Sequence, residues 1–157
     1  IGIQLLNNDR EWVGEPVILD KTITISEPDR LFDKPTTIHE TSIRWGNSIQ
    51  LSGYSINDNT LMLVWQTDNT PSKSLRLFVH ILDADGNIIA QSDSIPANWT
   101  RPTTSWIPEE YIITSHQFDL STGNYRIRIG WYDPITGERI NMNTSDSYTL
   151  ETPIIIN

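Results

Sequence analysis

Apolar and polar residues alternate in short blocks along most of the chain after residue 48. A period of two is typical of β-strands that bury one face, whereas no stretch sustains the 3.6-residue period of an amphipathic helix. The blocks predict strands over residues 49–53, 61–65, 75–82, 88–95, 111–120, 125–131, 148–150 and 154–156. We therefore expect an all-β protein with less than about one-tenth helix, against about one-third in an average globular protein.

The block 75–82 differs from the others because it is apolar on both sides. Leu75, Leu77, Val79 and Ile81 alternate with Phe78, His80 and Leu82. Apolar residues on both faces indicate a central strand that is covered on both sides, so His80 is interpreted as a core or near-core residue rather than a ligand. The inward faces of this and neighbouring strands predict a buried core of Leu51, Leu63, Trp65, Leu77, Val79, Ile81, Ile127, Ile129 and Trp131.

Turn residues separate these blocks. Asp85-Gly86 lies between two apolar runs and predicts a tight type I′ hairpin, since glycine tolerates the positive φ of such a turn. Residues 133–137 predict a second hairpin, with Pro134 early in the turn and Gly137 closing it. Seven to eight core strands at this spacing favour an antiparallel two-sheet β-sandwich, either immunoglobulin-like or jelly-roll-like.

The 157 residues are enough for one domain. We expect residues 41–157 to form the β-sandwich domain. Residues 1–40 are more polar and contain three prolines, which indicates an N-terminal connecting segment in which 17–19 and 22–25 are candidate edge strands. The chain starts with neither methionine nor a basic targeting segment, so we interpret it as a fragment or a mature product.

Charge and composition narrow the classes of partner. The chain has 11 basic and 20 acidic residues and a formal net charge of −9, which disfavours binding to nucleic acid or to an anionic membrane surface. Simple solubility is the plainer interpretation of that charge. The absence of cysteine excludes disulfides, thiolate zinc sites and a cysteine nucleophile. Because no apolar run approaches about 20 residues, we expect no membrane insertion of this fragment.

The sequence offers no recognisable catalytic centre, and we expect neither enzymatic activity, nor a metal site, nor a cofactor. Gly-x-Ser-x-Gly is absent, and residues 83–87 lack the distal glutamate of a calcium loop. Glu109 and Glu110 are adjacent and would point to opposite faces of a strand, although a distant pair such as Glu110 with Asp93 stays open. No zinc-type spacing relates the three histidines, His39, His80 and His116.

The loop over residues 94–110 is the strongest candidate for a ligand-binding surface, because loops of this length inside compact domains are often functional. Flat aromatic faces beside hydrogen-bonding groups are a common way to hold sugars. We expect Trp99 to stack on a saccharide, with Asn98 and Arg101 as hydrogen-bonding neighbours. Trp106 is a further candidate, although packing is the stronger expectation for it. The alternative is that one or both tryptophans cap the open end of the sandwich.

Several segments together resemble a known family. These are residues 49–54, 61–65, 77–87, 90–93, Pro96, 102–103, 106–108, Glu110, 123–126, 130–133 and 136–139, within a match that covers roughly residues 43–150. In this order they resemble the C-terminal, extracytoplasmic β-sandwich domain of bacterial multi-pass membrane glycosyltransferases of the dolichyl-phosphate-mannose type, and of related uncharacterised membrane proteins. The chain departs from that pattern where Glu109 replaces a usual Gly, and where Thr114 and His116 replace frequent Asp and Tyr.

The resemblance implies an extracytoplasmic location, periplasmic or at the cell surface, and a tether through a membrane region outside this chain. It also implies a link to glycan assembly, with a glycan or the membrane-embedded part of the same protein as partner. It does not imply catalysis, because in that family the transfer chemistry belongs to the membrane part. The first functional hypothesis is therefore a non-catalytic, carbohydrate-binding accessory module. The alternatives are a structural or protein-interaction domain without a small-molecule ligand, and a hydrolase for which no site is evident.

Overall fold

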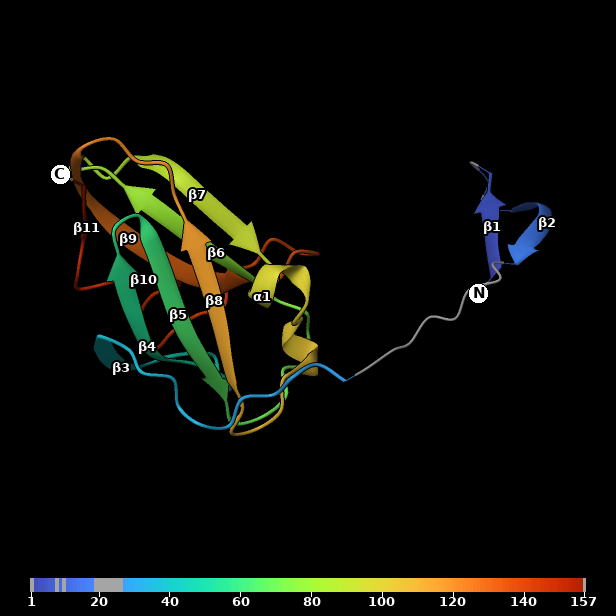
Figure 1. Ribbon diagram of the computed structural model, residues 1–157, viewed down its shortest axis with the longest axis horizontal. Coiled ribbons are helices and arrows are strands. Elements are labelled where there is room, and N and C mark those ends of the chain that lie inside the picture. Colours follow the sequence, from blue (N-terminus) through green and yellow to red (C-terminus); the bar gives the residue numbers. More distant parts are fainter. Residues whose placement is uncertain (1, 8, 10, 19–26, 157) are drawn as a thin grey trace.

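The computed structural model describes residues 2–7, 9, 11–18 and 27–156. Residues 39–156 form a sandwich of two antiparallel sheets (Figure 1), which confirms the predicted all-β fold. The first sheet has four strands in the order β3-β4-β5-β8. Their bounds are β3 (His39–Trp45), β4 (Ile49–Asn57), β5 (Thr60–Thr67) and β8 (Tyr111–Gln117).

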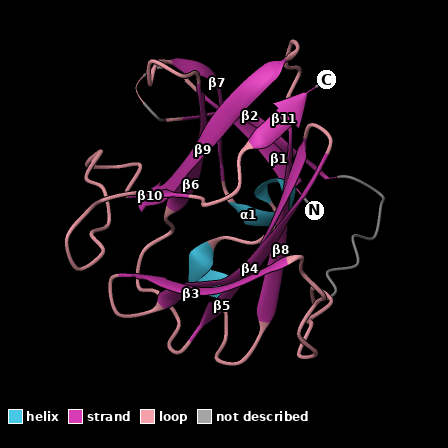
Figure 2. Ribbon diagram, turned by 90° about the vertical axis from the view of Figure 1, so that its left-hand side faces the viewer, coloured by secondary structure: helices cyan, strands magenta, loops and turns pink. Residues whose placement is uncertain are grey.

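The second sheet faces the first and has the order β10-β9-β6-β7, with β11 pairing to the same edge of β9 as β10 does. Figure 2 shows the two sheets as separate layers. Because β6 lies between β7 and β9, the prediction of a central strand there is confirmed. The bounds are β6 (Arg76–Leu82), β7 (Ile88–Ser94), β9 (Gly123–Tyr132), β10 (Tyr148–Thr149) and β11 (Ile154–Ile156).

The chain changes sheets three times in the sandwich. It leaves the first sheet after β5, forms the β6-β7 hairpin, returns to pair β8 with β5, and then crosses again to β9. The crossing from β7 to β8 contains the only helical segments of the described residues, α1 (Pro96–Trp99) and the 3-10 helix η1 (Thr103–Ser105). Both lie at one end of the sandwich (Figure 1). Nothing among the helices of the described residues is long and apolar enough to cross a membrane.

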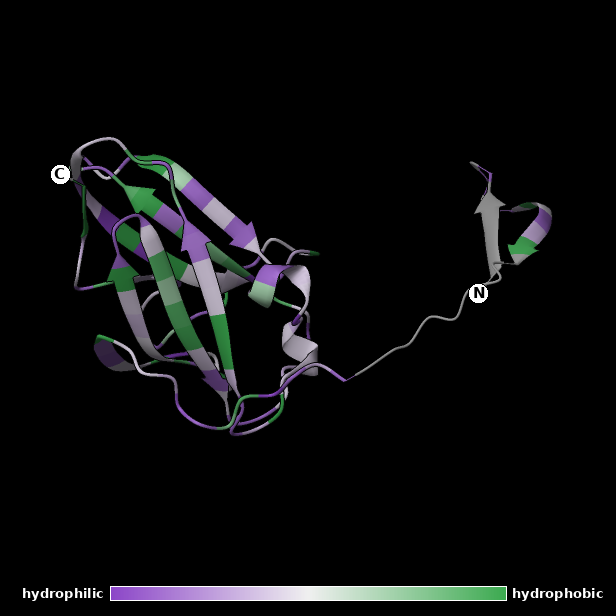
Figure 3. Cartoon of the chain, viewed as in Figure 1, coloured by the Kyte–Doolittle hydropathy of each residue, from purple (hydrophilic) through white to green (hydrophobic). Residues whose placement is uncertain are grey.

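The core lies between the two sheets and contains four fully buried tryptophans. The ring of Trp65 lies edge-on to Trp45 and Trp131, at centroid distances of 5.7 Å and 4.9 Å, and Trp106 lies edge-on to Trp131 at 5.7 Å. Such edge-to-face pairs are the arrangement that aromatic quadrupoles favour. All nine predicted core residues are fully buried, so the inward faces were assigned correctly. Figure 3 shows hydrophobic and hydrophilic bands that alternate along the strands, which is the pattern from which these core residues were predicted.

Both predicted hairpins exist, but the first has a different turn. Gly86 has a φ of 90°, and its amide donates to the carbonyl of Asp83 at 3.2 Å. A type I′ turn needs positive φ at two successive residues, and Asp85 does not have it. The turn is therefore longer, with a register shift in the adjoining ladder. In the second hairpin the amide of Gly137, at a φ of 76°, donates to the carbonyl of Asp133 at 2.8 Å.

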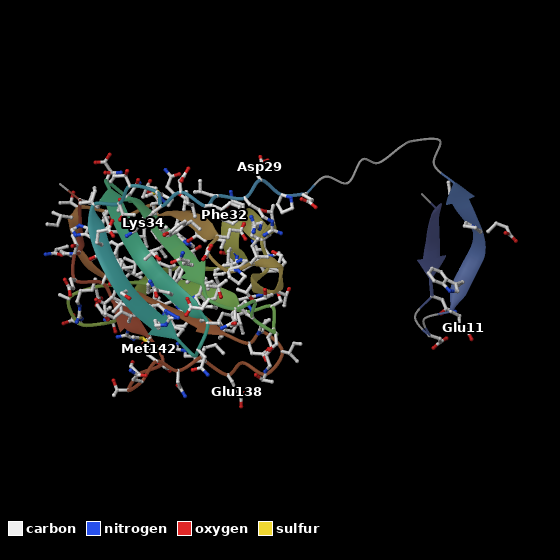
Figure 4. The ribbon with its side chains drawn as sticks, turned by 90° about the horizontal axis from the view of Figure 1, so that it is seen from below. Glu11, Asp29, Phe32, Lys34, Glu138 and Met142 are labelled. Carbon is white, nitrogen blue, oxygen red and sulfur yellow. The ribbon has the colours of Figure 1, made fainter. Side chains whose placement is uncertain are left out.

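The N-terminal region contains strands that the sequence did not predict correctly. β1 (Gly2–Leu6) and β2 (Trp12–Ile18) pair with each other, so Val17 belongs to a separate hairpin and not to an edge strand of the sandwich. The predicted strand over 22–25, and Leu19, lie outside the described residues. Strand β3 was not predicted. Residues 29–34 run along one side of the sandwich (Figure 4), where Leu31 bridges to Tyr111.

Candidate functional site

The loop between β7 and β8 begins with a turn in an uncommon conformation. Ala97, Asn98 and Trp99 have φ values of 52°, 52° and 68°, so three successive residues with side chains are left-handed. Each such residue costs roughly 1–2 kcal/mol. The turn is closed by the amide of Trp99, which donates to the carbonyl of Ile95, and by that of Arg101, which donates to Pro96, both at 3.1 Å. Strain of this kind is kept where surrounding structure enforces it, frequently at binding sites.

A buried carboxylate provides part of that enforcement. Glu110 is 0% exposed and forms ion pairs with Arg101 and, at 2.8 Å, with Arg30. Its Oε2 also accepts a hydrogen bond from the amide of Ile107 at 3.3 Å. Arg101 is itself buried, so its guanidinium is committed to the protein interior rather than to a surface ligand. Glu110 therefore ties the second half of the loop to the segment that carries Arg30, and its partners among the described residues do not include Asp93.

The two loop tryptophans have opposite surroundings. Trp106 is 0% exposed, and its indole Nε1 donates to the carbonyl of Arg101 at 3.1 Å. It belongs to the core, in agreement with the packing expectation, and its ring is out of reach of a ligand at the surface. Trp99 is 55% exposed and Asn98 is exposed as well. Of the four predicted ligand-binding residues, the structure thus leaves Trp99 and Asn98 at the surface and buries Arg101 and Trp106.

Trp99 does not stand alone, because it lies against the second sheet. The guanidinium carbon of Arg76, the first residue of β6, is 5.0 Å from the centre of the Trp99 ring. Arg76 points to the outer side of the sheet, since its alternate neighbours Leu75 and Leu77 point into the core. The cation–π contact therefore places the exposed tryptophan beside the outer face of β6.

That outer face carries the remaining side chains of the site. A hollow of about 340 Å³ is lined by residues from β6, β7, β9 and the turn that follows β9: Phe78, His80, Asp93, Tyr132, Gly137 and Arg139. The ring of Phe78 lies 4.8 Å from His80 and 6.5 Å from Tyr132, centroid to centroid. Tyr132 is the register partner of Arg76, which connects the hollow to the Trp99 contact. We call this surface the aromatic face and define it as Arg76, Phe78, His80, Asp93, Trp99 and Tyr132.

Local packing holds the floor of the hollow in place. Phe78 is opposite Gly130 on β9, and a Cβ at Gly130 would lie 2.4 Å from the Phe78 ring. Only glycine allows the ring to lie this close to the sheet. From the solvent side Arg139 covers Phe78 at 4.6 Å and forms an ion pair with Asp146 at 3.2 Å. The neighbouring side chain of Glu138 projects away from the sandwich (Figure 4).

The polar groups of the hollow can both donate and accept hydrogen bonds. Burial lowers the pKa of His80, with the charges of Arg139 and Arg128 acting in the same direction and Asp93 opposing them. His80 is therefore neutral at pH 7, when one ring nitrogen donates and the other accepts. Its Nδ1 is buried and has no partner in the described part of the chain. The hydroxyl of Tyr132 donates to Asp93 at 3.5 Å, a long contact that a ligand hydroxyl can replace.

A second hollow of about 510 Å³ lies on the other side of the turn 133–137. Its lining combines six polar residues with three apolar ones: Ser72, Lys73, Ser74, Arg76, Ile95, Asp133, Pro134, Ile135 and Thr136. Lys73 and Asp133 neutralise each other in an ion pair at 2.6 Å. Arg76 is thus common to this hollow and to the aromatic face.

Other polar pairs in the described residues have structural surroundings. The hydroxyl oxygen of Ser92 on β7 and Nδ1 of His116 on β8 are 3.0 Å apart, which joins the edges of the two sheets. Burial lowers the pKa of His116 to about 4, so its imidazole is neutral near pH 7. Thr114 accepts a hydrogen bond from the indole of Trp65 at 3.1 Å. No group of three or more His, Asp or Glu side chains among the described residues is arranged to hold a metal ion.

Comparison with known proteins returns no match: no family model, no curated protein and no solved structure is similar to this chain. The resemblance to the glycosyltransferase-associated domain therefore stays a prediction. The sequence did contain a signal for the aromatic face, because Phe78 and His80 stand on the second apolar side of the block 75–82. It did not indicate that Asp93, Tyr132 and Arg139 gather around them.

Proposed function

We propose that this protein is a non-catalytic carbohydrate-binding module that uses the aromatic face. The observation that supports this most is the exposed ring of Trp99, held by Arg76 beside a hollow with aromatic walls and with groups that donate and accept hydrogen bonds. Saccharides have apolar C–H faces and hydroxyl rims, and this surface offers a complement to both. Trp99 and Tyr132 would contact the C–H face, while His80 and Asp93 would bind hydroxyl groups and Phe78, covered by Arg139, would support the floor.

The site is held in one conformation by the protein itself. Preorganisation of this kind favours binding of weakly bound ligands such as sugars, because less conformational entropy is lost on binding. The left-handed turn at 97–99 is closed by backbone hydrogen bonds, and the Glu110 ion pairs hold Arg101, whose amide makes one of those bonds. A ring that is already immobile loses little conformational entropy when a ligand settles on it. The buried network of Arg30, Arg101 and Glu110 would thus serve binding indirectly, by positioning Trp99.

The cellular context of the proposal depends on the resemblance described above. On that basis the module would lie outside the cytoplasm, tethered through a membrane region, and would hold a glycan near an enzyme of glycan assembly. Its partners would be the glycan and the membrane-embedded part of the same protein. This context is an analogy at the level of the family and is separable from the binding site itself.

A glycan array followed by calorimetry tests the proposal. Wild-type protein should bind at least one class of saccharide, and Trp99→Ala should weaken that binding by about tenfold or more, since an aromatic contact of this kind contributes one to a few kcal/mol. Trp12→Ala is a matched control, because Trp12 is also exposed, at 66%, but belongs to β2. A protein that binds no glycan, or whose affinity falls equally in both variants, would refute the proposal.

A second candidate function is docking of a protein partner, and one residue favours it. Ile135 at the tip of the turn 133–137 is 91% exposed and borders the larger hollow. Exposed apolar residues beside a hollow are typical of protein-interaction surfaces. Ile135→Asp separates the two functions, because it should leave glycan binding unchanged while abolishing association with a protein partner.

A further inference from the structure

Basic side chains concentrate around the aromatic face although the chain as a whole is acidic. The chain has 11 lysines and arginines and a net charge of −9. Residues 126, 128, 130 and 132 of β9 point outward because Ile127, Ile129 and Trp131 are in the core. The basic residues on this side of the second sheet and in its adjoining loops are Lys73, Arg76, Arg126, Arg128 and Arg139. Acidic residues lie on the same side as well, among them Asp83, Asp93, Asp133 and Asp146, so this face is distinguished by which of its cations lack a partner and not by its net charge.

Three of these five cations already have partners. Lys73 pairs with Asp133 at 2.6 Å and Arg139 with Asp146 at 3.2 Å. Arg126 donates to two backbone carbonyls of the β6-β7 turn at 3.4 Å. Arg76 and Arg128, in contrast, have no side-chain hydrogen bond or ion pair within residues 27–156, and both are only partly exposed. A partly exposed guanidinium without a counter-ion in the protein keeps its N–H donors available to water or to an anionic ligand.

The positions of these two arginines relate them to the hollow. In the β6-β9 register Arg76 is opposite Tyr132, and Arg128 is opposite His80. Tyr132 and His80 both line the 340 Å³ hollow. Residues directly opposite in an antiparallel pair have Cβ atoms about 5 Å apart. The unpaired arginines therefore flank the hollow at two of its walls.

Arg76 is prepared to bind an anion. Its contact with Trp99 is made through the ring face and fixes the position of the guanidinium without using its N–H donors. Its Nε is buried and has no hydrogen-bond partner among the described residues, so a ligand would bind the two terminal Nη groups. Planar guanidinium groups with free donors bind carboxylate and sulfate groups through paired, charge-assisted hydrogen bonds.

We propose that the glycan recognised at the aromatic face carries an anionic substituent, a carboxylate or a sulfate, and that Arg76 binds it with Arg128 in support. The inference rests on the proposed function and narrows it from saccharides in general to acidic ones. Arg76 is then the specificity-determining residue, and Trp99 both contacts the sugar and positions Arg76. Because the chain as a whole is acidic, recognition of an anion would depend on these two unpaired arginines and would weaken with salt.

The test uses the whole chain on an array of neutral, uronate-containing and sulfated oligosaccharides, with the methyl esters of the uronates as uncharged matches. Bound glycans should be anionic, methyl esterification should abolish binding of uronates, and Arg76→Gln should weaken binding by about tenfold or more. Comparison of the uronate-containing with the sulfated oligosaccharides identifies which of the two anionic groups the protein binds. Arg44→Gln, on β3 of the first sheet, is the control for loss of one positive charge and should leave binding unchanged.

The outcomes separate this inference from the proposed function. Binding of neutral glycans that depends on Trp99 and is unaffected by Arg76→Gln would overturn the inference and leave the function standing. Absence of any bound glycan would overturn both. If Arg76→Gln fails to fold, Arg128→Gln gives the same comparison, and binding to anionic glycans that is insensitive to this substitution and to salt contradicts the inference.

Discussion

Glu110 is completely buried, and its carboxylate forms an ion pair with Arg101, nine residues earlier in the same loop. The residues between Arg101 and Glu110 include η1, α1 ends two residues before Arg101, and Arg30 brings a further segment of the chain to the same carboxylate. The network explains how a loop with several prolines and few strand contacts keeps a left-handed turn. The buried carboxylate of Glu110 stabilises the fold only while Arg101 and Arg30 are present to neutralise it.

Removal of that charge should destabilise the protein strongly. Glu110→Gln leaves two arginines facing a neutral amide in the interior, and breaking a buried ion pair on one side costs about 3–5 kcal/mol of unfolding free energy. Urea denaturation followed by circular dichroism measures the loss. Glu109→Gln is the matched control, because Glu109 is exposed, and its change should stay within about 0.5 kcal/mol. Equal effects of the two substitutions would show that the network contributes nothing.

The two loop tryptophans should have different roles: substitution of Trp106 should mainly lower the stability of the fold, and substitution of Trp99 should mainly weaken ligand binding. Trp106→Ala removes a fully buried ring and should cost about 3–5 kcal/mol, the range for large aromatic truncations. Trp99→Ala removes a half-exposed ring with one cation–π contact and should cost no more than about 1 kcal/mol. Denaturation midpoints of both variants decide this. Unfolding of Trp99→Ala would make that loop a structural cap.

The inward face of β9 gives a third prediction. Ile129 is fully buried between the sheets, so Ile129→Ala should lower the free energy of unfolding by about 2–5 kcal/mol. Ile135→Ala deletes the same atoms at a position that is 91% exposed and should change stability by less than about 0.5 kcal/mol. A loss below that value for Ile129→Ala is incompatible with the described register of β9.

Stability should depend on pH through His116. Its pKa is lowered from 6.5 to about 4 in the folded protein, so between these values the unfolded chain binds the proton more tightly. The contribution of neutral His116 is therefore complete above about pH 6.5 and is lost as the pH falls toward 4, by up to about 3 kcal/mol. Denaturation across this range should show a smaller slope for His116→Gln than for wild type. Titration of the His116 ring signals near pH 6.5 would contradict the described burial.

The local alternation of apolar and polar residues was sufficient to predict the positions of most strands of the sandwich. Each of the eight predicted strand positions is occupied, because a half-buried strand leaves its period in the sequence. Strand β3 was missed because it lies at an edge of its sheet and mixes Glu40, Thr41 and Ser42 with few apolar residues. The β1-β2 hairpin was missed for a related reason, since Trp12, Val13 and Val17 are all exposed and mark no buried face.

The site could be predicted only in part, since it depends on contacts between distant segments. Loop length and composition singled out Trp99 as a candidate, but they left open whether it is exposed or caps the sandwich. The burial of Arg101 does not, because it requires Glu110 together with Arg30 from a segment 80 residues away. The meeting of Asp93, Tyr132 and Arg139 around His80 likewise follows from the β7-β6-β9 order, which the alternation of apolar residues does not encode.

The central claim is that a saccharide binds on the aromatic face, and one measurement tests it most directly. The six tryptophan indole N–H signals are followed by ¹H–¹⁵N correlation spectroscopy during titration with the highest-affinity glycan from the array. We predict that the Trp99 indole moves most, together with the amides of Arg76, Phe78 and His80, while the indole of the equally accessible Trp12 stays in place. A Trp99 signal that is unmoved at saturation, with changes confined to the first sheet or to the β1-β2 hairpin, would contradict the account.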